Sequence, residues 1–150
     1  MKPVHQRIVD PERGDCYRAA VASVLDLDLD AVPAGIGSGF VEFGFLKEQG
    51  LCAVHLDVHR LTPRPDGYAG RTWDARNLVR FDFAAGAIAI ASVPSQKFPG
   101  SYHAVVVGFV ERPEGWVRLE CLHDPNPGNA PYDMDRTEIR SLTFYMPRRS

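Results

Sequence analysis

The sequence predicts an α+β fold in which helices come first and an antiparallel β-sheet follows. Helical apolar spacing with capping residues occurs between residues 15 and 50, whereas strand-like apolar runs occupy much of the chain after residue 52. This separation of helices from strands is typical of α+β proteins. The length of 150 residues, with 45% hydrophobic residues, is close to the commonest domain size. We therefore expect a single domain over residues 1–150.

The first helix is predicted to begin at about Cys16. Asp15 precedes it and belongs to the residue types that cap helix N-termini with their side chains. The apolar residues that follow have helical spacing: Ala19, Val21, Ala22, Val24 and Leu25. This prediction places Cys16 on the first turn.

A second, shorter helix is predicted over residues 40–50. Gly50 is a suitable C-cap because glycine adopts the left-handed conformation without steric cost. The aromatic residues Phe40, Phe43 and Phe45 are expected to pack in the core and not to form a ligand-binding cluster.

The strands are predicted over residues 52–59, 86–93, 103–110, 116–124 and 141–146, with a long loop from about residue 60 to 76. The second and third strands are continuous apolar runs, which suit buried strands. The third and fourth are separated by a short turn at residues 111–115, which predicts that they pair as antiparallel neighbours.

Composition argues against several classes of partner. The 17 Lys and Arg and 19 Asp and Glu give a formal charge of −2, and the basic residues are scattered, so neither nucleic acid nor an anionic membrane is expected to bind. The N-terminus lacks the apolar core of a signal peptide, and no stretch is apolar for long enough to span a bilayer. We expect a cytoplasmic protein.

The three cysteines, Cys16, Cys52 and Cys121, form no CxxC pair, so neither a disulfide framework nor a zinc site is indicated. Cys52 and Cys121 have apolar neighbours and are expected to pack as small buried hydrophobes. His55 and His59 are four residues apart, but their segment alternates like a strand, so we expect no metal site there.

Nucleophilic chemistry is predicted at Cys16. The N-terminus of a helix favours a thiolate through its unpaired N–H groups and its positive dipole end. The neighbouring carboxylate of Asp15 opposes ionisation, so a cationic partner is needed. His103, at the start of an apolar strand, is the expected partner and general base.

Asp124 and Gln6 complete the predicted site. Asp124 is at the end of the next predicted strand along the chain, so antiparallel pairing would bring it beside His103, where it could fix the imidazole tautomer. His123 should point to the opposite side of that strand. An oxyanion hole needs hydrogen-bond donors, which the Cys16 backbone N–H and the Gln6 side-chain amide could supply.

The sequence resembles the papain-like cysteine peptidase superfamily in the order of four features along the chain. These are Gln6, GDC at residues 14–16, HAVVV at 103–107 and HDP at 123–125. The similarity is especially to small bacterial and phage-borne members related to the bacteriocin-leader-processing peptidase domains, and it covers nearly the whole chain. It implies a cysteine-bearing helix packed on an antiparallel sheet, with Cys16 as nucleophile, His103 as base, Asp124 as orienting residue and Gln6 in the oxyanion hole.

The resulting expectation is a thiol hydrolase, a peptidase or amidase that cleaves an amide or isopeptide bond through an acyl-thioester and needs no cofactor. An acyltransferase with the same triad and a non-catalytic binding module that keeps the fold are the alternatives. The chain is shorter than papain, and Tyr17 and Arg18 follow the cysteine where the relatives have other residues, so substrate specificity does not carry over. Neither the substrate nor the oligomeric state follows from the sequence.

Overall fold

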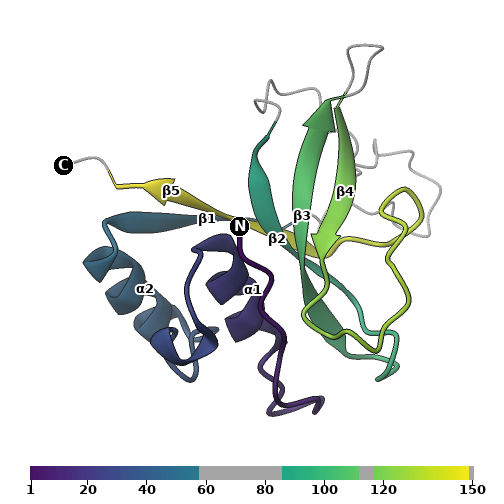
Figure 1. Ribbon diagram of the computed structural model, residues 1–150, viewed down its shortest axis with the longest axis horizontal. Coiled ribbons are helices and arrows are strands. Elements are labelled where there is room, and N and C mark those ends of the chain that lie inside the picture. The colour runs from purple at the N-terminus through teal and green to yellow at the C-terminus, as the bar shows by residue number, and fades with distance from the viewer. Residues whose placement is uncertain (58–85, 112–116, 149–150) are drawn as a thin grey trace, which may run out of the picture.

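The computed structural model describes residues 1–57, 86–111 and 117–148, and within them it has the predicted α+β architecture (Figure 1). The helices are α1 (Cys16–Val24), the 3₁₀-helix η1 (Leu29–Ala31) and α2 (Gly39–Glu48). The strands are β1 (Leu51–Asp57), β2 (Ile88–Pro94), β3 (Tyr102–Glu111), β4 (Val117–His123) and β5 (Ser141–Pro147). All five predicted strands are present, whereas η1 was not predicted. His59 and the predicted loop from residue 60 to 76 lie outside the described residues.

The five strands form one sheet in the order β1-β5-β2-β3-β4, and every neighbouring pair is antiparallel. The predicted pairing of the third and fourth strands is confirmed. The last strand along the chain, β5, lies between β1 and β2 and therefore joins the first strand to the other three.

Both faces of β2 and β3 are covered, which explains the continuous apolar runs of these two strands. Successive residues of these strands point to opposite faces, so even-numbered residues such as Ile90 and Val106 pack under α1 and α2. Odd-numbered residues such as Ala91 and Val107 pack on the other face, where Met134 and Ile139 of the segment before β5 cover them. The helices lie together on one side of the sheet (Figure 1).

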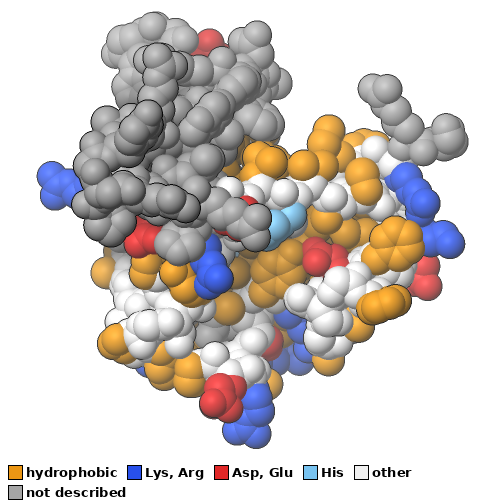
Figure 2. Space-filling view, turned by 180° about the vertical axis from the view of Figure 1, so that it is seen from behind, with side chains coloured by type: hydrophobic (Ala, Val, Ile, Leu, Met, Phe, Trp, Pro, Cys, Tyr) orange, Lys and Arg blue, Asp and Glu red, His pale blue; other side chains and the backbone are white. Residues whose placement is uncertain are grey.

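The second helix differs from the prediction in the face that it buries. Phe45 is buried, but Phe40 is 96% exposed and Phe43 is 63% exposed, so the expectation that all three rings belong to the core is wrong. Figure 2 shows hydrophobic side chains on the outer surface of the molecule. Gly50 follows the helix with φ of +68°, as its role at the C-terminus requires.

No helix in the described residues has the length and apolar character needed to cross a lipid bilayer.

Candidate active site

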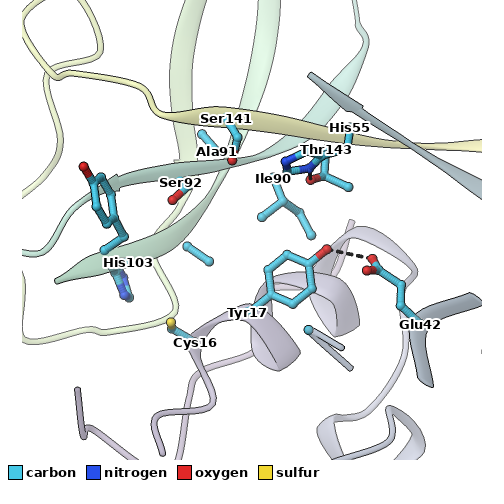
Figure 3. A pocket seen from close by; sticks show the side chains of 13 residues that line it. Cys16, Tyr17, Glu42, His55, Ile90, Ala91, Ser92, His103, Ser141 and Thr143 are labelled. Atoms are coloured by element: carbon cyan, nitrogen blue, oxygen red, sulfur yellow. Dashed lines mark hydrogen bonds between the residues drawn. The ribbon is translucent and has the colours of Figure 1, made fainter. Parts of the chain in front are cut away.

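Cys16 is the first residue of α1, as predicted, and its side chain is partly buried. The helix packs against β2 and β3, so its N-terminal turn faces the start of β3, where His103 lies. Figure 3 shows the Cys16 sulfur directed toward the His103 ring. The backbone N–H groups of Tyr17 and Ala104 donate hydrogen bonds to this sulfur.

His103 and Asp124 are joined as the sequence predicts. The Nε2 atom of His103 lies 2.6 Å from Oδ1 of Asp124. The pairing of β3 with β4 causes this contact, because it places the end of β4 beside the first half of β3. Because Nε2 is hydrogen-bonded to Asp124, Nδ1 is the ring nitrogen left to interact with the Cys16 sulfur.

The three groups shift one another's pKa values. Burial opposes the charge on His103, but the hydrogen bonds to Asp124 and Cys16 outweigh it and raise the pKa of His103 to about 9. Burial likewise raises the pKa of Cys16, but hydrogen bonds from His103 and the backbone and the charge of His103 lower it more, so the net pKa is below its usual value. Burial raises the pKa of Asp124. The hydrogen bonds to this carboxylate, of which the one with His103 has the largest effect, outweigh burial and bring its pKa below the usual range. These directions favour a thiolate–imidazolium pair.

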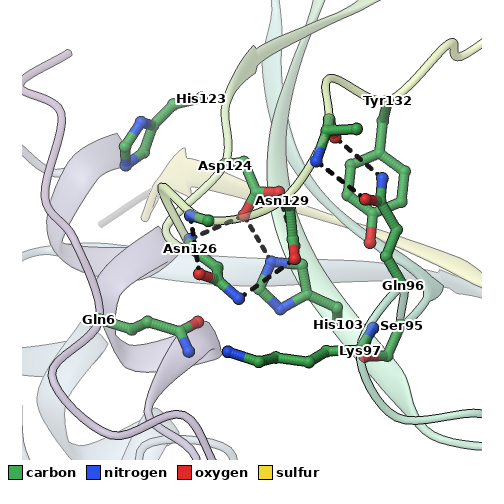
Figure 4. A network of polar contacts seen from close by, with 12 residues as sticks. Gln6, Ser95, Gln96, Lys97, His103, His123, Asp124, Asn126, Asn129 and Tyr132 are labelled. Atoms are coloured by element: carbon green, nitrogen blue, oxygen red, sulfur yellow. Dashed lines mark hydrogen bonds and ion pairs between the residues drawn. The ribbon is translucent and has the colours of Figure 1, made fainter.

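Two asparagines that sequence analysis did not identify hold the Asp124 carboxylate (Figure 4). The backbone N–H of Asn126 donates to Oδ1 at 2.8 Å, and the Asn129 side chain donates to Oδ2 at 2.9 Å. Asn126 also donates from its side chain to Asn129. The NPGN run after Asp124 is rich in turn-forming residues, which was the available signal. Tyr132 stacks on the His103 ring, with 6.3 Å between the centroids.

Asp15 takes the N-cap position of α1, as predicted, although its side chain makes no capping hydrogen bond to the helix. The carboxylate instead accepts the backbone N–H groups of Arg7 and Ile8 at 3.0 and 2.9 Å. It therefore binds the N-terminal segment. Burial, which raises the pKa of Cys16, and the contacts with His103 and the backbone, which lower it, do not involve this carboxylate.

Gln6 is brought to the site by this N-terminal segment. Its backbone N–H donates to the Pro125 carbonyl, next to Asp124, and its side chain lines a small cavity of about 30 Å³ together with Cys16, His103 and Lys97. The amide Nε2 donates to the Ile8 carbonyl at 3.3 Å, and the buried Oε1 has no hydrogen-bond partner among the described residues. Nε2 carries a second proton, which this contact leaves available.

A larger cavity of about 330 Å³ is also lined by Cys16 and His103 (Figure 3). Its far end is polar: Tyr17, Glu42 and Thr143 line it, and the Tyr17 hydroxyl donates to the Glu42 carboxylate at 2.7 Å. Glu42 carries no signal in the sequence, because only the packing of α2 beside α1 and the sheet brings it to this cavity.

The other cysteines and histidines lie apart from this arrangement. Cys52 is exposed on β1, so the expectation that it is buried is wrong. Cys121 is partly buried against the core, and burial raises its pKa to about 11. His123 is buried with its Nε2 2.8 Å from the Val4 carbonyl and so faces the N-terminal segment, while His55 contacts the Thr143 hydroxyl. No group of three or more potential metal ligands occurs within residues 1–57, 86–111 and 117–148.

Comparison of the chain with protein-family models, with curated proteins and with solved structures finds no match.

Proposed function

We propose that this protein is a thiol hydrolase of the papain-like type, a peptidase or amidase that cleaves an amide or isopeptide bond. The observation that carries the proposal is the contact of His103 with Asp124 at 2.6 Å on one side and with the Cys16 thiol on the other. The order of the three groups along the chain and the position of Cys16 at the start of α1 add support. So does the direction of the pKa shifts.

The proposed reaction begins with a thiolate on Cys16 and a proton on His103. The sulfur attacks the carbonyl carbon of the substrate, and the oxygen takes up negative charge. The Cys16 backbone N–H, which is in the first turn and has no acceptor within the helix, donates to this oxyanion together with Gln6. His103 then passes its proton to the leaving nitrogen, and the C–N bond breaks to give an acyl-thioester.

Water completes the cycle. His103, now neutral, removes a proton from the water as its oxygen attacks the thioester carbon. The C–S bond breaks, the carboxylic acid product leaves, and Cys16 returns as the thiolate beside protonated His103. Asp124 keeps Nε2 of His103 engaged throughout, so that Nδ1 always faces the reacting atoms.

The proposal is tested with fluorogenic peptide and amide libraries and three proteins: wild type, Cys16→Ala and Cys52→Ala. We expect Cys16→Ala to lower turnover by about 10³-fold or more, and we expect mass spectrometry to detect an acyl adduct on wild-type Cys16. Cys52→Ala is the matched control, because it removes an exposed thiol that does not line the cavity of Cys16 and His103, and it should leave turnover unchanged. Undiminished turnover in Cys16→Ala would contradict the proposal. A lack of turnover together with an unreactive Cys16 would favour the binding-module alternative.

A further inference from the structure

The cavity beside Cys16 and His103 ends at a carboxylate. Glu42 of α2 lines this cavity, and its Oε1 atom accepts hydrogen bonds from two tyrosines, Tyr17 at 2.7 Å and Tyr145 at 2.8 Å. The two hydroxyls are 3.0 Å apart, so Oε1 is held between them. Tyr17 directly follows Cys16 in the sequence, and both residues line the same cavity as Glu42 (Figure 3).

This carboxylate has no cationic partner within the described residues. The cavity lining includes no Lys or Arg of residues 1–57, 86–111 and 117–148. Arg148 lines a neighbouring cavity, but its guanidinium lies over the Phe43 ring and makes no ion pair with Glu42. Both hydrogen bonds from the tyrosines go to Oε1, so Oε2 receives none from the described part of the chain. A partly buried carboxylate with an unused oxygen suits a ligand that supplies a positive charge and N–H donors.

We propose that this end of the cavity binds a cationic group of the substrate, the ammonium or guanidinium of a basic side chain next to the bond that Cys16 attacks. The inference rests on the proposed function, since it names the substrate class of the same site. The Tyr17 ring also lines the cavity, and aromatic rings attract cations. Burial, with the charge of Glu42 adding to it, raises the pKa of Tyr17 and Tyr145, so both hydroxyls stay protonated and remain donors to the carboxylate.

The test uses acylated amino-acid chloromethyl ketones, which alkylate an active-site thiol without requiring turnover. Four reagents carry lysine, norleucine, arginine or citrulline, so each cationic side chain has a neutral counterpart of similar length. We expect the lysyl or arginyl reagent to alkylate Cys16 about tenfold or more faster than its neutral counterpart, as expected for a hydrogen-bonded charge contact. Comparison of the lysyl with the arginyl reagent shows which cation fits better.

Two variants assign the effect to Glu42. Glu42→Gln should bring each cationic-to-neutral rate ratio close to one, whereas Glu48→Gln, an exposed change on the same helix outside the cavity, should leave the ratios as in wild type. Equal rates for charged and neutral reagents in wild type would overturn the inference even if Glu42→Gln did not fold. A cation preference that survives in folded Glu42→Gln would also overturn it.

The outcome also separates this inference from the proposed function. Rapid alkylation of Cys16 by all four reagents at the same rate removes the cation site but leaves the thiol hydrolase in place. Alkylation of Cys16 no faster than that of the exposed Cys52 removes both.

Discussion

At the scale of single residues, the state of the His103 ring decides what the site can do. The Asp124 carboxylate is one of the two groups that raise the pKa of His103 to about 9 against the effect of burial. The pair of Cys16 thiolate and His103 imidazolium exists above the lowered pKa of the thiol and below the raised pKa of the imidazole. Activity that needs both partners should therefore follow a bell-shaped pH profile.

We predict that Asp124→Ala moves the upper limb of this profile to lower pH. Removal of the carboxylate lowers the pKa of His103 from about 9, so the imidazolium loses its proton earlier as the pH rises. Asp124→Asn should retain more turnover than Asp124→Ala, because an amide oxygen can still accept from Nε2. The measurement is kcat/KM against pH for the three proteins, with any substrate found in the library screen. An upper limb at the same pH in Asp124→Ala would show that the carboxylate does not support the imidazolium.

Sequence order was enough to predict that Cys16, His103 and Asp124 lie together, since each stands at one end of a predicted element. It could not find Asn126 and Asn129 as the holders of Asp124, because turn-forming residues commonly bond only to their own turn. Nor could it find Glu42, whose partner Tyr145 is 103 residues away and meets it only after β5 inserts into the sheet.

At the scale of elements, the N-terminal segment acts as a strap between α1 and the turn after β4. The Val4 N–H donates to the Ser23 hydroxyl, and the Gln6 N–H donates to the Pro125 carbonyl. Asp15 fixes the same segment through Arg7 and Ile8, which places Gln6 in the small cavity beside the thiol.

We predict that Asp15→Ala lowers the free energy of unfolding by about 1 kcal/mol, because it removes the acceptor of two backbone N–H groups. Asp15→Asn should lower the free energy of unfolding by less, since the amide oxygen can still accept one of the two backbone N–H groups. In both variants the alkylation rate of Cys16 at pH 6 should match the wild type, since the Asp15 carboxylate is engaged with the strap. Urea unfolding and iodoacetamide kinetics give the two quantities. A marked rise in thiol reactivity would instead mean that the Asp15 charge suppresses the thiolate, as the sequence alone suggested.

A helix or strand could be predicted from the sequence where its burial produces a regular pattern of apolar residues. The strands β2 and β3 are largely apolar because both of their faces are covered, so their pattern was clear in the sequence. The buried face of α2 could not be predicted, because its phenylalanines are distributed around the helix. Only the packing of the helix determines that Phe45 is buried and Phe40 is exposed. The short helix η1 has too few residues to produce a periodic pattern.

At the scale of the whole molecule, β5 holds the sheet together. It pairs with β1 along seven residues and with β2 along three, and Leu142 lies opposite Leu56 on one side and Ala91 on the other. The Leu142 side chain is in the core cluster on the face away from the helices. The site depends on this strand, because the large cavity is lined by Ser141 and Thr143 from β5 as well as by residues of α1 and β3.

We predict that Leu142→Ala lowers the free energy of unfolding by about 2–5 kcal/mol, the range for a fully buried leucine. Leu122→Ala makes the same chemical change on β4, but Leu122 is 40% exposed whereas Leu142 is 0% exposed. The loss in free energy of unfolding should therefore be clearly smaller for Leu122→Ala. Urea unfolding of both variants measures the difference. Equal losses would mean that the core is not centred on β5.

If His103 maintains the thiolate of Cys16, the pKa of that thiol must depend on the imidazole. The measurement is the pH dependence of Cys16 alkylation by iodoacetamide in wild type and in His103→Ala, followed peptide by peptide so that Cys52 and Cys121 serve as internal references. We predict that Cys16 reacts much faster than either reference at pH 6 in wild type, although Cys52 is the more exposed thiol. In His103→Ala the pKa of Cys16 should rise toward or above the free value of about 8.5, because burial then acts without the imidazolium that opposes it. An unchanged pKa of Cys16 in His103→Ala would contradict the account.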